Sequence, residues 1–440
     1  MTINNVTFKD SNKNSNCISQ HSSEYEYVAA LKTIFDKKLF PNDFDIWPVQ
    51  EQSIWITKNI AKFFPNTPES LLNLMPAWFR GMIDRSDGKK PEWLNMDKYR
   101  RGQKFVRDHW FSVVISTILG LMHIYSFNDA LKPIIISRKT HTPYLGFKRY
   151  LETIRHFFTW YCGEPWLKGT LAYNNMQYAC KMHSMMRAKL DKLDNEQIDN
   201  ASKIPELWCP DHEILVKDFA AACIFEKSEQ RPYILLEKSP YRPKGINNSD
   251  MAGMQCSFVA LFLLCPQSIG VHNATDEDIE AFCYLWRCYG YCLGMEDEYN
   301  FCRGSLEEIK QRTRDLYQYW LLPNFKDITP EWEHMTRCLV ESVNNIPLIY
   351  MPYKVMTLIS TDILNLNMSN LYKSLSYSEW IAHKVWTFIF RYGLQFSIVK
   401  SIFNKVAYKL LDIAMNFGPE KQIELQEKSK KQLSNFSGIY

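Results

Sequence analysis

The chain has 440 residues, of which 46% are apolar and 14% aromatic, so it can bury a large core and is globular rather than disordered. Lys and Arg together number 52 and Asp and Glu 48, which gives a net charge of +4 spread along the sequence without a basic stripe. This even distribution argues against nucleic acid as a partner.

Periodic apolar patterns recur between helix caps, Gly and Pro are few, and strand-like alternation is scarce, which predicts an all-α fold. Residues 1–22 are rich in Asn, Ser and Lys and are expected to form a flexible lead-in. A capping box of Ser23 and Glu26 predicts the start of the first helix, which Pro41 ends. The apolar stripe over residues 51–64 predicts another.

A long uncharged segment follows, because no Asp, Glu, Lys or Arg occurs between Asp108 and Asp129. Its length is sufficient to cross a bilayer, but polar side chains such as Ser112 and His123 lower its apolarity. Two interpretations stay open: a central core helix, which is favoured, and a membrane span. A second uncharged run, 251–275, is interrupted by proline and glycine and is typical of a core segment.

The C-terminal part begins with clear caps and ends in a polar tail. Thr275 with Asp278 predicts the start of one helix, and further starts are predicted at Ser305 and Thr329. Residues 384–417 are apolar with Lys and Arg at intervals, so this segment either packs on the domain or lies in a membrane interface. The last 23 residues, from Gly418, are charged and polar and predict a solvated terminal helix or a frayed tail.

Twelve cysteines raise the possibility of disulfides or a metal site. The N-terminus lacks the pattern of a secretory signal, which favours an intracellular, reducing compartment and free thiols. Cys288 and Cys292, spaced i, i+4, could share a metal, although buried apolar packing is the commoner role of such cysteines.

The most informative polar pattern joins Arg149, Thr153 and His183. Arg149 and Thr153 lie one helical turn apart on one face, and His183 follows thirty residues after Thr153 on a second apolar helix. A histidine in such surroundings is either a core residue with satisfied ring nitrogens or a ligand of iron.

These residues resemble a known family. The run K-R-x-L-x-T-x-x-x-F-x-x-W, followed by Pro165 and M-H-x-x-x-R, is similar to the haem-dependent oxygenases that include latex clearing protein (rubber oxygenase) and the endoplasmic-reticulum-bound oxygenase mpaB. A later W-R helix within residues 275–300 adds to the likeness, which spans residues 40–305.

The resemblance implies a haem b held without covalent attachment, with His183 as the proximal iron ligand through Nε2 and its other nitrogen donating to a carbonyl or carboxylate. It implies that Arg149 lies near the distal side of the haem or near a propionate, and that the hydroxyl of Thr153 hydrogen-bonds dioxygen. Arg287 is expected to be either a propionate partner or a surface ion pair, and Trp286 is expected to pack in the core.

Glu152 departs from the family pattern, because rubber oxygenases carry a lysine immediately before the threonine. A carboxylate there could act as an acid or base, form a salt bridge, or face solvent. This substitution puts a rubber-type distal site in doubt, and leaves open whether the chain turns over substrate. His109, His123 and His156 are alternative axial ligands.

The overall prediction is a single all-α domain with globin-like helix packing around a haem pocket. Its expected parts are a lead-in over 1–22, a haem-binding domain over 23–310, packed or membrane-facing helices over 311–417, and a polar tail over 418–440. The implied function is oxidative C=C cleavage of an apolar isoprenoid or lipid with dioxygen. The alternatives are an inactive haem- or lipid-binding protein and a cofactor-free membrane-associated scaffold. Association with the endoplasmic-reticulum membrane is a further expectation.

Overall fold

The structure, a computed structural model, describes residues 12–223, 231–237 and 239–437. Within these ranges every regular element is helical, which confirms the predicted all-α class and single fold. The helices share one large apolar core, and a small second cluster consists of Ile136, Leu190 and Ile198. The N-terminal helices are α1 (Asn12–Ile34), α2 (Val49–Lys58), α3 (Ile60–Phe63), α4 (Glu69–Leu72) and α5 (Leu74–Ala77).

The middle of the chain forms the central layers of the molecule. These helices are α6 (Met96–Asp108), α7 (Trp110–Ile124), α8 (Asn128–Ile136), α9 (Pro143–Cys162), α10 (Leu171–Asp191), α11 (Asn195–Ala201), α12 (His212–Ala222), α13 (Pro232–Glu237), α14 (Asn248–Leu264) and α15 (Asp276–Cys292).

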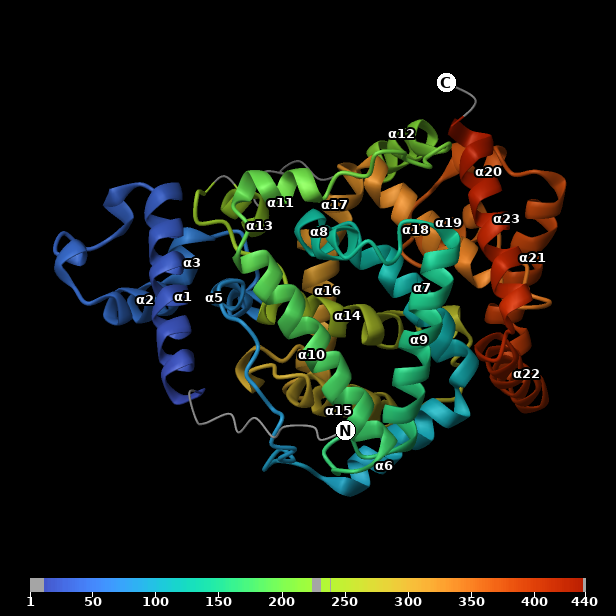
Figure 1. Ribbon diagram of the computed structural model, residues 1–440, viewed down its shortest axis with the longest axis horizontal. Coiled ribbons are helices and arrows are strands. Elements are labelled where there is room, and N and C mark those ends of the chain that lie inside the picture. The colour runs from blue at the N-terminus through green and yellow to red at the C-terminus, as the bar shows by residue number, and fades with distance from the viewer. Residues whose placement is uncertain (1–11, 224–230, 238, 438–440) are drawn as a thin grey trace, which may run out of the picture.

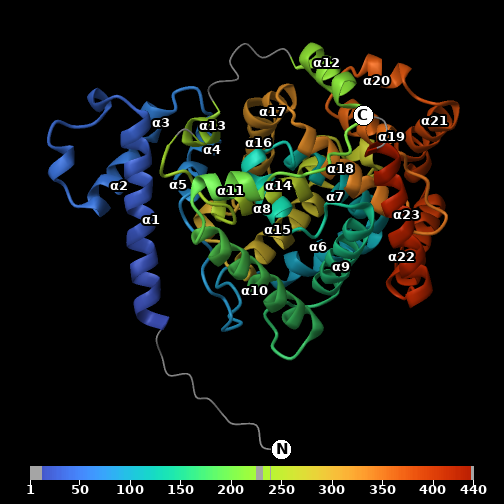
Figure 2. The ribbon, with the colours of Figure 1, turned by 45° about the horizontal axis from the view of Figure 1, so that its top comes forward.

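The C-terminal helices are α16 (Leu306–Leu316), α17 (Leu322–Lys326), α18 (Pro330–Val343), α19 (Tyr353–Asp362), α20 (Ser369–Lys373), α21 (Tyr377–Arg391), α22 (Ser397–Met415) and α23 (Pro419–Ser437). Figures 1 and 2 show α1–α3 at one end of the molecule, α21–α23 at the opposite end, and α9 and α10 between them.

The first helix begins earlier than the sequence indicated. Helix α1 starts at Asn12 and runs without a break through Ser23, so the expected helix start at Ser23 and the expected lead-in over 12–22 are wrong. Serine is tolerated in helix interiors at small cost, so a possible capping residue does not by itself begin a helix. Residues 1–11 lie outside the described part of the chain.

Close helix contacts build the core. Helix α7, which contains the uncharged run, is buried along nearly its whole length and packs against α14. Gly120 makes this approach possible, because a Cβ at this position would lie 1.9 Å from the carbonyl oxygen of Ser257 on α14. Gly102 on α6 has the same role against α15, where a Cβ would lie 2.4 Å from the oxygen of Ala281.

In the described ranges, no single helix is long and apolar enough to span a membrane. Only α6 and α7 together pass such a test, and they are bent by 90° where they meet.

The two C-terminal segments pack on the domain. Helix α22 contacts α7 and α9, and Asn404 bridges it to the α6–α7 junction by accepting from the amide of Phe111 at 2.9 Å. The polar tail forms helix α23, which packs on α9, and the amide of Tyr144 donates to Ser429 at 3.1 Å. The prediction of a terminal helix is therefore confirmed over Pro419–Ser437.

Candidate functional site

Helices α9 and α10 form a V whose closed end lies at their connection. Each helix has a threonine N-cap, Thr142 for α9 and Thr170 for α10. Near the connection, Asn175 donates to the hydroxyl of Thr159 at 2.9 Å and ties the arms together. From there the two helices diverge (Figure 1).

A cavity of 450 Å³ lies in this V, within the range of about 300–1,000 Å³ that holds cofactors and drug-sized ligands. Helices α7, α8, α14 and α15 supply its remaining walls, and it opens to solvent past exposed side chains such as Met185. The apolar wall contains Leu121, Ile134, Phe157, Met182, Met186, Met251, Met254, Phe258 and Trp286.

One face of α9 presents polar side chains to this cavity. Arg149, Glu152, Thr153 and His156 follow the spacing i, i+3, i+4, i+7, and all four line it. His183 lines the same cavity from α10. The structure thus brings together in one place the arginine, glutamate, threonine and histidine that the sequence pattern singled out.

His183 has the properties of a neutral imidazole available for ligation. Burial, and secondarily the charge of Arg149, lower its pKa to about 4, so the ring is uncharged at neutral pH. Nδ1 is buried without a hydrogen-bond partner among the described residues, so the expected carbonyl or carboxylate acceptor is not found. Within the described ranges, Nδ1 of His109, His141, His212 and His383 is also buried without a partner, so it is the position of His183 in the cavity that distinguishes this ring.

The hydroxyl of Thr153 is already engaged. It donates to the carbonyl oxygen of Arg149, one turn earlier on the same helix, at 2.9 Å. Since a hydroxyl has a single proton, Thr153 offers the cavity an acceptor oxygen in this rotamer. The expected hydrogen bond from Thr153 to dioxygen therefore requires the hydroxyl to rotate away from its own helix.

His156 is a second imidazole in the cavity. It is buried, and its ring meets that of Tyr178 on α10 edge-on, 5.3 Å between centroids. Burial lowers its pKa, while the charge of Glu152, one turn away, acts in the opposite direction. The sequence suggested His156 only as an alternative ligand, although its place seven residues after Arg149 indicates the shared face.

Charged side chains gather at the rim. Lys139, Arg149 and Lys189 line the cavity together with only two carboxylates, Glu152 and Asp250. Burial raises the pKa of Asp250 to about 6, although the amide of Ile246 donates to its carboxylate at 2.7 Å. Cations therefore outnumber anions at this site at neutral pH, a balance that suits a ligand carrying acidic groups.

Arg287 is not part of this site. Its guanidinium donates through Nε and Nη2 to both oxygens of Asp297, at 2.9 and 2.6 Å, and lies over the ring of Trp93 at 4.0 Å. Arg287 does not line the cavity, so the suggested propionate contact is wrong and the ion-pair alternative holds. Its neighbour Trp286 does line the cavity and stacks on Phe258, with centroids 4.4 Å apart.

The remaining histidine and cysteine candidates lie elsewhere. The ring nitrogens of His123 contact the hydroxyls of Tyr317 and Ser360 at 3.0 and 2.8 Å, so it is a satisfied core histidine. His109 packs against Phe105 with centroids 4.9 Å apart. Cys288 and Cys292 are buried, and over the described ranges no cluster of three or more His, Cys, Asp or Glu side chains could hold a metal ion.

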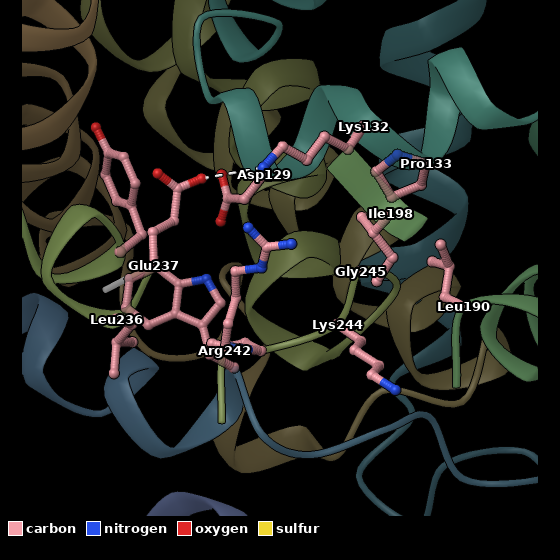
Figure 3. A pocket seen from close by; sticks show the side chains of 13 residues that line it. Asp129, Lys132, Pro133, Leu190, Ile198, Leu236, Glu237, Arg242, Lys244 and Gly245 are labelled. Atoms are coloured by element: carbon pink, nitrogen blue, oxygen red, sulfur yellow. Dashed lines mark hydrogen bonds and ion pairs between the residues drawn. The ribbon is translucent and has the colours of Figure 1, made fainter. Parts of the chain in front are cut away.

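A second, smaller pocket lies beside α8 and shares Pro133 with the larger cavity (Figure 3). Its volume of 30 Å³ has room for about one water molecule. Lys132 bridges Asp199 and Glu237 there, at 3.0 and 3.4 Å, and burial raises the pKa of Asp129 to about 7. This pocket is a charged packing junction and is too small for a cofactor.

The residues that line the larger cavity are compatible with a haem b. A haem iron needs one protein ligand, and the cavity contains a neutral, unsatisfied imidazole in His183. Its walls are apolar and its rim cations match two propionates. In comparisons with known proteins, this chain matches no family model, no curated protein and no solved structure, so the assignment depends on the site itself.

Proposed function

We propose that the chain is a haem b-dependent oxygenase that cleaves a C=C bond of an apolar isoprenoid or lipid, and that its helices pack in a globin-like manner around the cofactor. One observation supports the proposal most strongly: Arg149, Thr153 and His183, selected by sequence spacing, line a single apolar cavity of 450 Å³.

In this proposal His183 binds the iron, and Lys139 and Lys189 pair with the propionates. When bound, haem supplies the activation of dioxygen, which side chains alone cannot provide. Addition of one O₂ across a C=C bond gives two carbonyl groups, so both oxygen atoms enter the products and no external reductant is consumed.

The chain's own side chains bind and orient the substrate. The Met and Phe side chains of α10 and α14 bind a hydrocarbon and exclude water from the cavity. Arg149 places a permanent positive charge where negative charge develops on oxygen. Glu152 and His156, one turn apart, can hold or pass a proton at the cavity wall.

Titration of the purified chain with hemin tests the cofactor. A Soret band should develop with one hemin per chain, and His183→Ala should abolish it because the iron ligand is removed. His212→Ala is the matched control, since His212 is a partly exposed histidine outside the cavity. An absent Soret band in the unmodified chain, or an unchanged band in His183→Ala, contradicts the proposal.

A haem- or lipid-binding protein without turnover is the second candidate. It is favoured by the carboxylate at Glu152 and by the engagement of the Thr153 hydroxyl with its own helix. Oxygen uptake and carbonyl formation with a panel of unsaturated lipids separate the two, because only the oxygenase consumes O₂.

A further inference from the structure

The two helices at the C-terminal end of the molecule carry an apolar surface that nothing in the described chain covers. Helices α21 and α22 are joined by a short turn at Gly393–Gln395, and exposed apolar side chains occur on both helices and in the turn region. We call this surface the apolar elbow; it consists of Trp380, Ile381, Val385, Phe388, Tyr392, Phe396, Ile398, Ile402 and Val406.

The exposure of the elbow is systematic. On α21 the exposed apolar residues recur every three or four positions, and on α22 Ile398, Ile402 and Val406 form a row at i, i+4, i+8. The opposite faces are buried, through Phe390 on α21 and Leu411 on α22. Each helix therefore has an apolar face against the domain and a second apolar face towards solvent.

The tip of the elbow is the most exposed part. Phe388, Phe396 and Ile398 are 62%, 60% and 77% exposed. A contiguous apolar surface of this kind is rare on a soluble monomer and marks an interaction site.

The charges around the elbow identify the partner. On α21 and α22 the exposed basic residues Lys384, Arg391, Lys405 and Lys409 outnumber the acidic residues, which are Glu379 and Asp412. Aromatic rings beside lysine and arginine suit the headgroup region of a bilayer that contains anionic lipid. A second copy of the chain would instead bring like charges together.

We propose that the apolar elbow inserts into the surface of an anionic lipid bilayer and holds the molecule there as a peripheral protein. Phe388, Phe396 and Ile398 enter the acyl boundary, and Arg391 and Lys405 bind lipid phosphates. This inference does not depend on the cofactor, because the elbow and the cavity share no residue.

Vesicle flotation of the full chain tests the proposal. The chain should float with vesicles of phosphatidylcholine and phosphatidylserine and should bind vesicles of phosphatidylcholine alone weakly. The double variant Phe388→Ser/Ile398→Ser should lose about tenfold or more in affinity, since two large apolar side chains no longer leave water. The charge variant Arg391→Glu/Lys405→Glu should lose binding to the anionic vesicles, and salt should weaken binding by the unmodified chain.

The matched control is Ile46→Ser/Ile54→Ser. These isoleucines are 84% and 55% exposed and lie in the N-terminal part, at the opposite end of the molecule (Figure 1). The control should float like the unmodified chain, and circular dichroism should show that all variants are folded. Equal flotation of the elbow variant and the control overturns the proposal, as does a lack of flotation or equal binding to both vesicle types. A dimer in light scattering that the elbow substitutions dissociate, without vesicle binding, assigns the surface to a second copy instead.

Discussion

Arg149 and His183 influence each other across the cavity without a direct hydrogen bond. Burial lowers the pKa of His183, and the charge of Arg149 lowers it further, to about 4. The arginine therefore helps to keep the imidazole in the neutral form, which is the form that binds a metal.

Replacement of Arg149 by Gln should raise the pKa of His183, because the smaller of the two causes that lower it is removed. The value should stay below 6.5 because burial, the larger cause, remains. An NMR titration of the His183 ring in the hemin-free chain measures this shift. Arg155→Gln is the control, since that charge acts on His156 rather than His183. An unchanged His183 pKa in Arg149→Gln would place the guanidinium too far away to act on the ring.

At the scale of helices, glycine allows two helix backbones to approach closely, and this approach sets the distance between walls of the site. Gly120 lets α7 approach α14, and both helices contribute wall residues to the cavity. A methyl group at Gly120 would meet backbone atoms of Ser257, which cannot rotate away as the end of a side chain could.

Gly120→Ala should therefore reduce the free energy of unfolding by about 1–3 kcal/mol or more, because the two helices must separate. Gly81→Ala is the control, since a Cβ at Gly81 meets no atom within 4 Å. Urea denaturation of both variants gives the comparison. Equal stability of the two would mean that α7 and α14 move apart without cost.

Local signals predicted several elements because they depend on neighbouring residues alone. The capping boxes at Thr275 and Ser305 and the Thr329 cap all mark helix starts in the structure. The shared face of Arg149 and Thr153 followed from helical periodicity in the same way. The buried alternative for the uncharged run is also borne out in α7.

Side-chain partners and rotamers were not predictable from the sequence. The choice of Arg287 between a propionate and an ion pair depended on Asp297, which reaches it only through the turn after α15. The hydrogen bond from the Thr153 hydroxyl to the carbonyl of Arg149 depended on the side-chain rotamer. The composition of the cavity wall depended on how α14 and α15 pack against α9 and α10. A sequence pattern cannot fix these, because they follow from packing.

Across the whole molecule, burial determines how stability varies with pH. His109, His123, His183 and His334 all have a pKa lowered by burial to about 4. Such a histidine takes up a proton when the chain unfolds below pH 6.5, so its contribution to stability is lost as the pH falls from about 6.5 to 4. Buried carboxyls with a raised pKa act in the opposite direction, among them Asp129, at about 7, and Asp250, at about 6.

With His141, His156 and His212, whose pKa burial also lowers, such histidines outnumber the buried carboxyls with a raised pKa, so the hemin-free chain should be less stable near pH 5 than at neutral pH. Buried glutamates such as Glu333, whose pKa burial also raises, reduce this difference in stability. Urea denaturation at neutral pH and near pH 5 measures the change. A higher urea midpoint at the lower pH would contradict the expectation, because the carboxyls would then dominate.

The V of α9 and α10 has a consequence for the order in which the chain acquires its site. Helices α9 and α10 end by Asp191, but two walls of the cavity come from α14 and α15, which extend to Cys292. Until that later part of the chain has been synthesised, the cavity has the walls from α7 and α8 but lacks those from α14 and α15. A fragment that ends before α14 therefore contains His183 and Arg149 but no enclosed chamber, and ligand capture must wait for the second half of the polypeptide.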